Sequence, residues 1–178
     1  MAKNFTNRYS MSAIVVAMIA VVISATVVMS GTAEAKGPRP FMGDASGVFI
    51  ANGGEGVINA THLGEGTVVF SGLTLDEGNP EFSGLPIACF PVTAGLQTFT
   101  AANGDELHMS YDDGTFCADV TNGPPGMPHH GDFITNVTGG TGRFEGATGQ
   151  IIINAVGGFD GTNVTFSSKF GADSWIDY

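Results

Sequence analysis

The chain has 178 residues, and its 17 acidic residues against 6 lysines and arginines give a formal net charge of −11 at pH 7. This surplus of negative charge repels nucleic-acid phosphates and anionic lipid headgroups, so neither is an expected partner. The 27 glycines stand between stretches of alternating apolar residues, which excludes a low-complexity chain and favours a β-rich domain.

The N-terminal residues have the three-part layout of a secretory signal peptide. Lys3 and Arg8 give a positive start, residues 13–29 form a run without charge, and Ala33 and Ala35 are small residues at a cut site. We predict cleavage after Ala35, which makes the protein secreted, periplasmic or part of the cell envelope. The alternative is that residues 13–29 are retained as an anchor, which would be the only expected contact with a membrane.

After residue 35 the chain is long enough for one domain and too short for two. We expect a short linker over residues 36–42 and a single domain over residues 43–178. Beyond Met29 no stretch has apolar residues at helical spacing for more than about one turn, so the domain is predicted to be all-β.

Short runs with strand-like alternation recur along this domain, separated by glycine, asparagine and aspartate. The clearest unit is residues 96–111, in which Asn103-Gly104 separates two such runs; this is a strong hairpin signal because both residues of a type I′ turn need positive φ. The other runs cover residues 47–51, 56–63, 66–75, 115–120, 131–138, 149–157 and 163–170. Their number and spacing favour an antiparallel sandwich or a small closed barrel.

Two proline-containing segments interrupt this series, over residues 76–95 and 121–132, and we expect both to be long irregular loops. Cys89 and Cys117 lie in the part of the chain that is predicted to be exported. An even cysteine count in an oxidising compartment favours one disulfide, and two buried free thiols are the alternative. The run Met127 to His130 contains side chains that bind copper or zinc, but a solvated loop is favoured and no metal site is expected.

Residues 139–149 are rich in glycine, and they form either a phosphate-binding loop or a connection between strands. A phosphate loop places a helix after its glycines and a P-loop needs a lysine, whereas here the strand-like residues 150–153 follow. We therefore predict a strand connection in which the glycines adopt positive φ or pack closely, and in which Phe144 plugs one end of a barrel. The predicted structural residues are Gly139, Gly140, Thr141, Gly142, Phe144, Gly146 and Gly149.

The stretch TGGTGRFEGATGQIII, residues 138–153, resembles the Gly-Gly-Thr/Ser-Gly-x-Phe/Tyr-x-x-Ala/Val-x-Gly signature of the allene oxide cyclase-like and dirigent β-barrels. The Phe-Glu-Gly at residues 144–146 and the Gly-Gln at residues 149–150 are very similar to the plant cyclases. Residues 60–72 and 100–114 resemble segments of small exported bacterial proteins with the same glycine motif. The resemblance implies a small antiparallel eight-stranded barrel with an apolar central cavity, assembled as a homodimer or homotrimer.

In this family, plant cyclases close an unsaturated epoxide into a cyclopentenone, dirigent proteins steer radical coupling, and some bacterial relatives cyclise polyketides. Each holds a flexible apolar substrate in one shape. The resemblance therefore implies that a small apolar molecule binds in the lumen, where a fatty-acid-like or polyketide-like chain is isomerised or cyclised without a cofactor. The alternative is a non-catalytic exported structural or interaction module whose barrel is filled by side chains.

The cyclases of this family use a buried polar cluster that includes a carboxylate. Glu55, Asn59 and Asn103 are residues of the right types and are the candidate catalytic residues, although no matching motif fixes their positions. Candidate lumen residues are the large or polar side chains on alternating runs, and alternation alone leaves their direction open. They are His62, Phe70, Phe99, His108, Met109, Phe133 and Ile152.

Overall fold

The computed structural model describes residues 37–50, 53–76, 81–82, 87–119, 128–159 and 162–178. All of them belong to one compact unit that runs from Ala35 to Tyr178. The predicted signal peptide, with the apolar run over residues 13–29, lies outside the described residues. Within the described ranges, no helix is long and apolar enough to cross a membrane.

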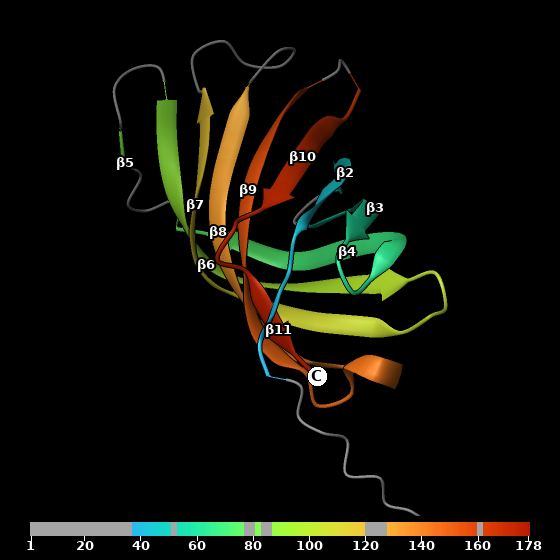
Figure 1. The fold of residues 1–178 in the computed structure, drawn as a ribbon. Coiled ribbons are helices and arrows are strands. Elements are labelled where there is room, and N and C mark those ends of the chain that lie inside the picture. Colours follow the sequence, from blue (N-terminus) through green and yellow to red (C-terminus); the bar gives the residue numbers. More distant parts are fainter. Residues whose placement is uncertain (1–36, 51–52, 77–80, 83–86, 120–127, 160–161) are drawn as a thin grey trace, which may run out of the picture. The chain divides into compact units, whose positions relative to one another are not determined.

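Eight antiparallel strands close into a barrel, in which each strand pairs with the next and β10 pairs with β2 (Figure 1). The predicted all-β fold, a closed antiparallel barrel of about eight strands, is confirmed. The strands are β2 (Gly43–Ile50), β3 (Gly53–Ala60), β4 (Gly64–Leu75), β6 (Ile87–Ala101), β7 (Glu106–Asp119), β8 (His129–Gly140), β9 (Thr148–Phe159) and β10 (Val164–Phe170).

Three short strands add to the barrel: β1 (Arg39–Pro40), β5 (Glu81–Phe82) and β11 (Trp175–Asp177). β5 pairs with β6, β11 pairs with the first residues of β9, and β1 pairs with β11. The prediction of a linker over residues 36–42 is therefore wrong for residues 39–41, which belong to the folded domain. The Phe41 ring is fully buried and fills part of the barrel interior. The Phe41 N–H donates a hydrogen bond of 2.8 Å to the Ser174 carbonyl.

The two segments predicted as irregular loops are shorter than expected. β6 begins at Ile87, inside the first segment, and β8 begins at His129, inside the second. Pro91 is tolerated in β6 because the pairing with β4 is irregular at this point. The register between β4 and β6 shifts nearby, and β4 ends at Leu75. The Pro91 carbonyl accepts a hydrogen bond from the Asp76 N–H just after that end. Residues 77–80, 83–86 and 120–127 lie outside the described residues.

The hairpin at Asn103-Gly104 joins β6 to β7 as predicted, but its turn type differs. Among the described residues of this loop only Gly104 has positive φ, at +88°. The Asn103 amide donates to the Asp105 carboxylate at 2.8 Å, and its side-chain oxygen accepts from the Asp105 N–H at 3.2 Å. The loop over residues 102–105 therefore follows the pattern of a longer hairpin with a single left-handed glycine.

Cys89 and Cys117 lie directly opposite each other on β6 and β7 and are joined in a disulfide, as predicted. Both are buried, at 7% and 5% exposure. A bond of this kind fits an extracellular protein, because disulfides persist in oxidising compartments.

The glycine-rich stretch connects β8 to β9 through a short 3-10 turn, η1 (Gly142–Phe144). Strand β9 follows the turn, so the stretch has the geometry of a strand connection. Thr141 ties it to β7: its N–H donates to the Glu106 carbonyl at 2.8 Å, and its hydroxyl accepts from the Glu106 N–H at 3.0 Å. β8 also approaches β7 closely here, since a Cβ on Gly140 would overlap the Glu106 carbonyl oxygen.

Replacing Gly142 by valine should lower the free energy of unfolding by about 1–3 kcal/mol. Gly142 has φ of +57°, a conformation that residues with a Cβ avoid, and a Cβ at this position would overlap the Asp105 carboxylate. Urea denaturation of the full chain measures the loss. Gly37→Val is the matched control, because Gly37 has open space around its Cα. Equal stability of the two variants would contradict an architectural role for Gly142.

Candidate functional site

The barrel interior next to η1 is a packed core, and we call this half the η1 end. The rings of Phe41 and Phe99 stack at 6.0 Å, and Phe170 packs against both at 5.3 and 5.5 Å. The fully buried ring of Phe144 contacts Tyr178 at 5.0 Å and plugs this end. Other nearly inaccessible side chains here are Leu107, Ile151 and Ile176. The η1 end is filled by side chains.

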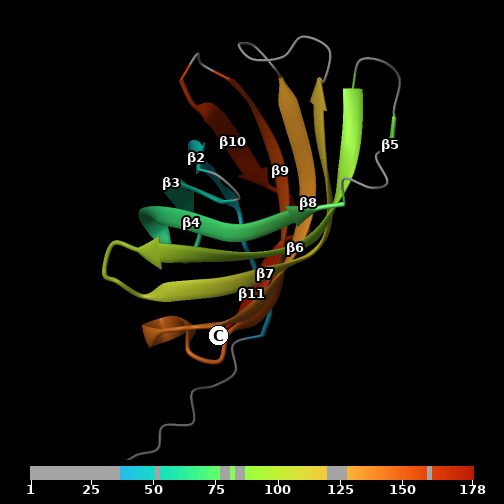
Figure 2. The ribbon, with the colours of Figure 1, turned by 180° about the vertical axis from the view of Figure 1, so that it is seen from behind.

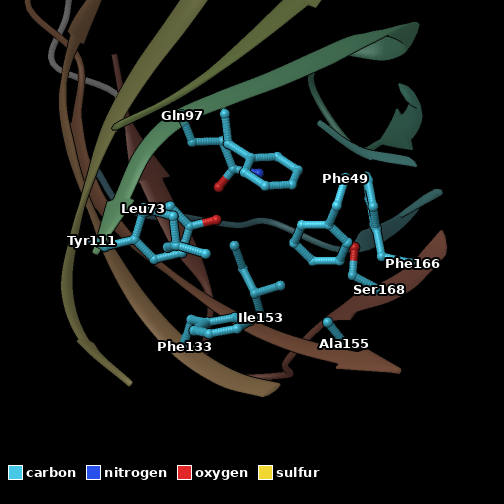
Figure 3. Close-up of a pocket in the computed structure, with 10 residues that line it drawn as sticks. Phe49, Leu73, Gln97, Tyr111, Phe133, Ile153, Ala155, Phe166 and Ser168 are labelled. Carbon is cyan, nitrogen blue, oxygen red and sulfur yellow. The ribbon is translucent and has the colours of Figure 1, made fainter. Parts of the chain in front are cut away.

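The other half of the lumen holds a cavity of about 30 Å³. This volume accommodates one polar group, or about two water molecules. Seven of the eight barrel strands contribute to its wall, so the cavity lies inside the barrel (Figure 3). The lining residues are Phe49, Phe70, Leu73, Gln97, Tyr111, Phe133, Ile153, Ala155, Phe166 and Ser168.

One side of the cavity is polar. Gln97 is only 7% exposed, and its Oε1 has no hydrogen-bond partner among the described residues. The Gln97 side-chain oxygen and the Tyr111 hydroxyl both point into the same space (Figure 3). Burial raises the pKa of the Tyr111 hydroxyl above its usual range, so this group stays protonated and able to donate a hydrogen bond. The hydroxyl of Ser168 donates to the Ala45 carbonyl at 3.3 Å.

The opposite side of the cavity is aromatic and centres on Phe49. Its ring meets Phe70 at 5.2 Å and Phe166 at 5.5 Å, both in edge-to-face contacts. Farther from η1 it also meets Phe116 at 6.3 Å and His129 at 5.5 Å. Such edge-to-face contacts are a favoured arrangement of aromatic side chains. The cavity therefore has a polar side and an apolar side.

Four of the candidate lumen residues, Phe70, Phe99, Met109 and Phe133, are buried inside the barrel. Phe70 and Phe133 line the cavity itself. Phe99 belongs to the packed half, and Met109 is fully covered beside Thr135.

The other three candidate lumen residues lie outside, which corrects the prediction. His62 lies in the turn after β3, with φ of +65°, and its Nε2 is 3.2 Å from the Pro40 carbonyl oxygen. His108 points outward because its neighbours on β7 point inward, and its Nε2 is 2.9 Å from a Glu106 carboxylate oxygen. Ile152 lies between two inward residues of β9 and packs against Gly171.

The candidate catalytic residues do not line the cavity either. Glu55 and Asn59 alternate outward on β3 and are exposed, and Asn103 lies in the exposed hairpin loop. Among the described residues that line the cavity, none is a carboxylate, lysine, arginine or histidine. The cavity can therefore bind and orient a molecule, but the residues described in its wall offer no strong acid or base.

Sequence reasoning missed Gln97 and Tyr111, although a signal for both was present. Gln97 lies two positions before Phe99 on β6, and Tyr111 lies two positions after Met109 on β7. Residues two apart on a strand share a face. Once Phe99 and Met109 are placed in the lumen, the same alternation places Gln97 and Tyr111 there.

Comparison with protein-family models, with curated proteins and with solved structures found no match to this chain. The resemblance to allene oxide cyclase-like barrels and the expected dimer or trimer stay predictions. In the described part of the chain, no group of three or more histidines, cysteines and acidic residues is placed to hold a metal ion. Of the run Met127 to His130, Met127 lies outside the described residues, and His129 packs against Phe116 at 5.4 Å.

Proposed function

We propose that the barrel binds a small neutral molecule with an apolar body and one hydrogen-bond donor, such as a hydroxyl or an N–H group. One observation carries this proposal: the buried Gln97 Oε1 faces the cavity without a partner among the described residues. A buried acceptor left unpaired costs about 1–3 kcal/mol, and a donor from a ligand would recover this free energy.

The chemistry of the cavity favours a hydroxyl group in particular. A hydroxyl can donate to the Gln97 oxygen and accept from the protonated Tyr111 hydroxyl at the same time. An anionic group is disfavoured, since the described residues of the lining include no cationic side chain and the chain as a whole carries a charge of −11. The ligand is therefore expected to be uncharged.

The cavity volume also determines how such a ligand would lie. About 30 Å³ takes the polar group alone, so in this proposal the apolar body displaces the Phe49 ring and lies among Phe70, Phe116 and Phe166. An aromatic ring turns about two side-chain torsions, which makes this rearrangement accessible. A fatty-acid-derived alcohol or a polyketide-like ring has the required combination of an apolar body and a neutral polar group.

For any reaction, the residues in the cavity wall support orientation and desolvation of the substrate. A cofactor-independent isomerase or cyclase, as the family resemblance implies, would therefore act by holding a reactive chain in one shape. The disulfide supports the proposal that this takes place outside the cytoplasm, in a secreted or cell-envelope protein.

Gln97→Leu should weaken binding of N-phenyl-1-naphthylamine, a neutral fluorescent probe with one N–H donor, by about tenfold. The variant keeps a side chain of similar volume and removes the acceptor. Fluorescence titration of the full chain measures the affinity. Thr98→Leu is the control, since Thr98 is the next residue on β6 and points away from the cavity. Equal affinities of Gln97→Leu and the parent would contradict the proposed role of Gln97.

The small cavity favours a second function, a non-catalytic module whose barrel is filled by side chains. Native mass spectrometry of protein purified from its own host separates the two functions. A co-purifying small molecule supports the binding function. A bare polypeptide mass, together with no binding of N-phenyl-1-naphthylamine by the parent, supports the filled module.

A further inference from the structure

The barrel wall has a break in strand pairing beside the cavity. β6 and β7 pair over residues 87–91 with 115–119 and over 96–100 with 106–110, but residues 92–95 and 111–114 between these stretches have no registered partners in this strand pair. Both strands bend sharply at this level (Figure 2). Bulges and bends of this kind occur at barrel rims and beside functional sites.

The neighbouring strand pairs are irregular at the same level. The register between β4 and β6 shifts between Ser71 and Leu75, and the register between β7 and β8 shifts between Tyr111 and Asp113. Three adjacent pairings in the wall are therefore irregular at this level. At this level the wall of the barrel is closed by packed side chains as well as by backbone hydrogen bonds between strands.

Tyr111 is the side chain that fills the break. It lines the inner cavity together with Gln97 and Leu73, and it also lines a depression of about 420 Å³ on the outer surface. Its ring packs on Gly95, where an added Cβ would lie 2.7 Å from the Tyr111 Cδ2 atom. The Tyr111 side chain thus separates the inner cavity from the depression on the outer surface.

The outer depression suits a neutral apolar molecule. Its described lining contains no charged side chain, on a protein whose net charge is −11. Leu96, which is 62% exposed, lies in it. The lining residues are Ser71, Gly72, Thr93, Ala94, Gly95, Leu96, Ser110 and Tyr111.

The two edges of the break are held firmly. On one side the Cys89–Cys117 disulfide joins β6 to β7, and on the other side the regular ladder begins at Leu96 and Ser110. The strands on either side therefore stay together, and the movable part is the Tyr111 ring, which turns about two torsions.

We propose that this break is a side entrance to the lumen and that Tyr111 is its gate, a role that rests on the proposed binding function. In this mechanism the Tyr111 ring swings aside, the ligand passes from the outer depression into the cavity, and the ring returns to cover it. The Tyr111 hydroxyl then meets the polar group of the bound ligand. Gating of this kind sets association and dissociation rate constants.

Ala94→Trp tests the entrance from outside, because Ala94 lines the depression and does not line the cavity. In stopped-flow fluorescence with N-phenyl-1-naphthylamine and the full chain, both rate constants should fall by about tenfold, with little change in Kd. Val156→Trp is the matched control, since Val156 is 60% exposed on the outer face of β9. It should leave both rate constants unchanged.

Tyr111→Ala tests the gate itself and should raise the association rate constant by about tenfold. A tyrosine that only lines the wall would affect the dissociation rate constant and leave association unchanged. If the parent binds the probe but neither Ala94→Trp nor Tyr111→Ala alters association, the side entrance is overturned and the binding function stands. If the parent binds no probe, both proposals fall.

Discussion

Phe144→Ala should lower the free energy of unfolding by about 3–5 kcal/mol, the largest effect that we expect from a single substitution in this barrel. The Phe144 ring is fully buried and packs against Tyr178, and the Arg143 guanidinium carbon lies 4.9 Å from the ring centre. Alanine would leave a cavity at the η1 end, where the β8–β9 connection meets the C-terminal residues. Urea denaturation of the full chain measures the loss.

Two control variants show whether the loss comes from packing. Phe144→Leu retains most of the buried volume and should cost less than alanine, about 1 kcal/mol. Val156→Ala removes an exposed apolar side chain from the outer face of β9 and should stay within about 0.5 kcal/mol of the parent. If Phe144→Ala is as stable as Val156→Ala, the ring does not plug the barrel and our account of the glycine-rich connection fails.

Removing the disulfide by the double substitution Cys89→Ala and Cys117→Ala should lower the free energy of unfolding by about 3–4 kcal/mol. The bond joins residues that are 28 positions apart, so it restricts the unfolded chain by closing a long loop. Urea denaturation with and without a reducing agent measures the effect. The reducing agent should destabilise the parent and leave the double variant unchanged.

A second measurement tests the bond itself. Thiol titration of the unfolded, unreduced parent should find no free thiol, because both cysteines are in the disulfide. Two free thiols, together with equal stability of the parent and the double variant, would show that the strand ladder alone holds β6 to β7 at this point.

Local patterns in the sequence determined much of the fold. Alternating runs separated by turn residues predicted an all-β domain, either an antiparallel sandwich or a small barrel, because the period of two follows from the geometry of a strand. The closed eight-stranded barrel was implied by the resemblance of residues 138–153 to a barrel family. Asn103-Gly104 predicted the hairpin between β6 and β7, and the strand-like residues 150–153 predicted a strand after the glycine-rich stretch. These features depend on residues that are adjacent in the chain, so they can be predicted from the sequence alone.

Tertiary structure alone decided which faces point inward. Alternation assigns the residues of a strand to two faces but does not say which face is the lumen, and a shift of one residue exchanges them. Ile152 was therefore placed on the wrong side of β9, and His62 was expected on a strand that ends at Ala60. Phe41 was missed because its burial depends on a pairing with the distant C-terminal residues.

The candidate site also required the tertiary structure. Gln97 and Tyr111 stand on different strands, and their side chains reach the same cavity only through the register and the bend of β6 and β7. The break in the wall beside Tyr111 depends on three strand pairings at once, and no local run of residues encodes it. Closure of the barrel by β10 and β2 joins segments at opposite ends of the domain. The sequence thus determined the strands and their turns, whereas the cavity arises from long-range pairing, because only pairing sets the neighbours of each inward side chain.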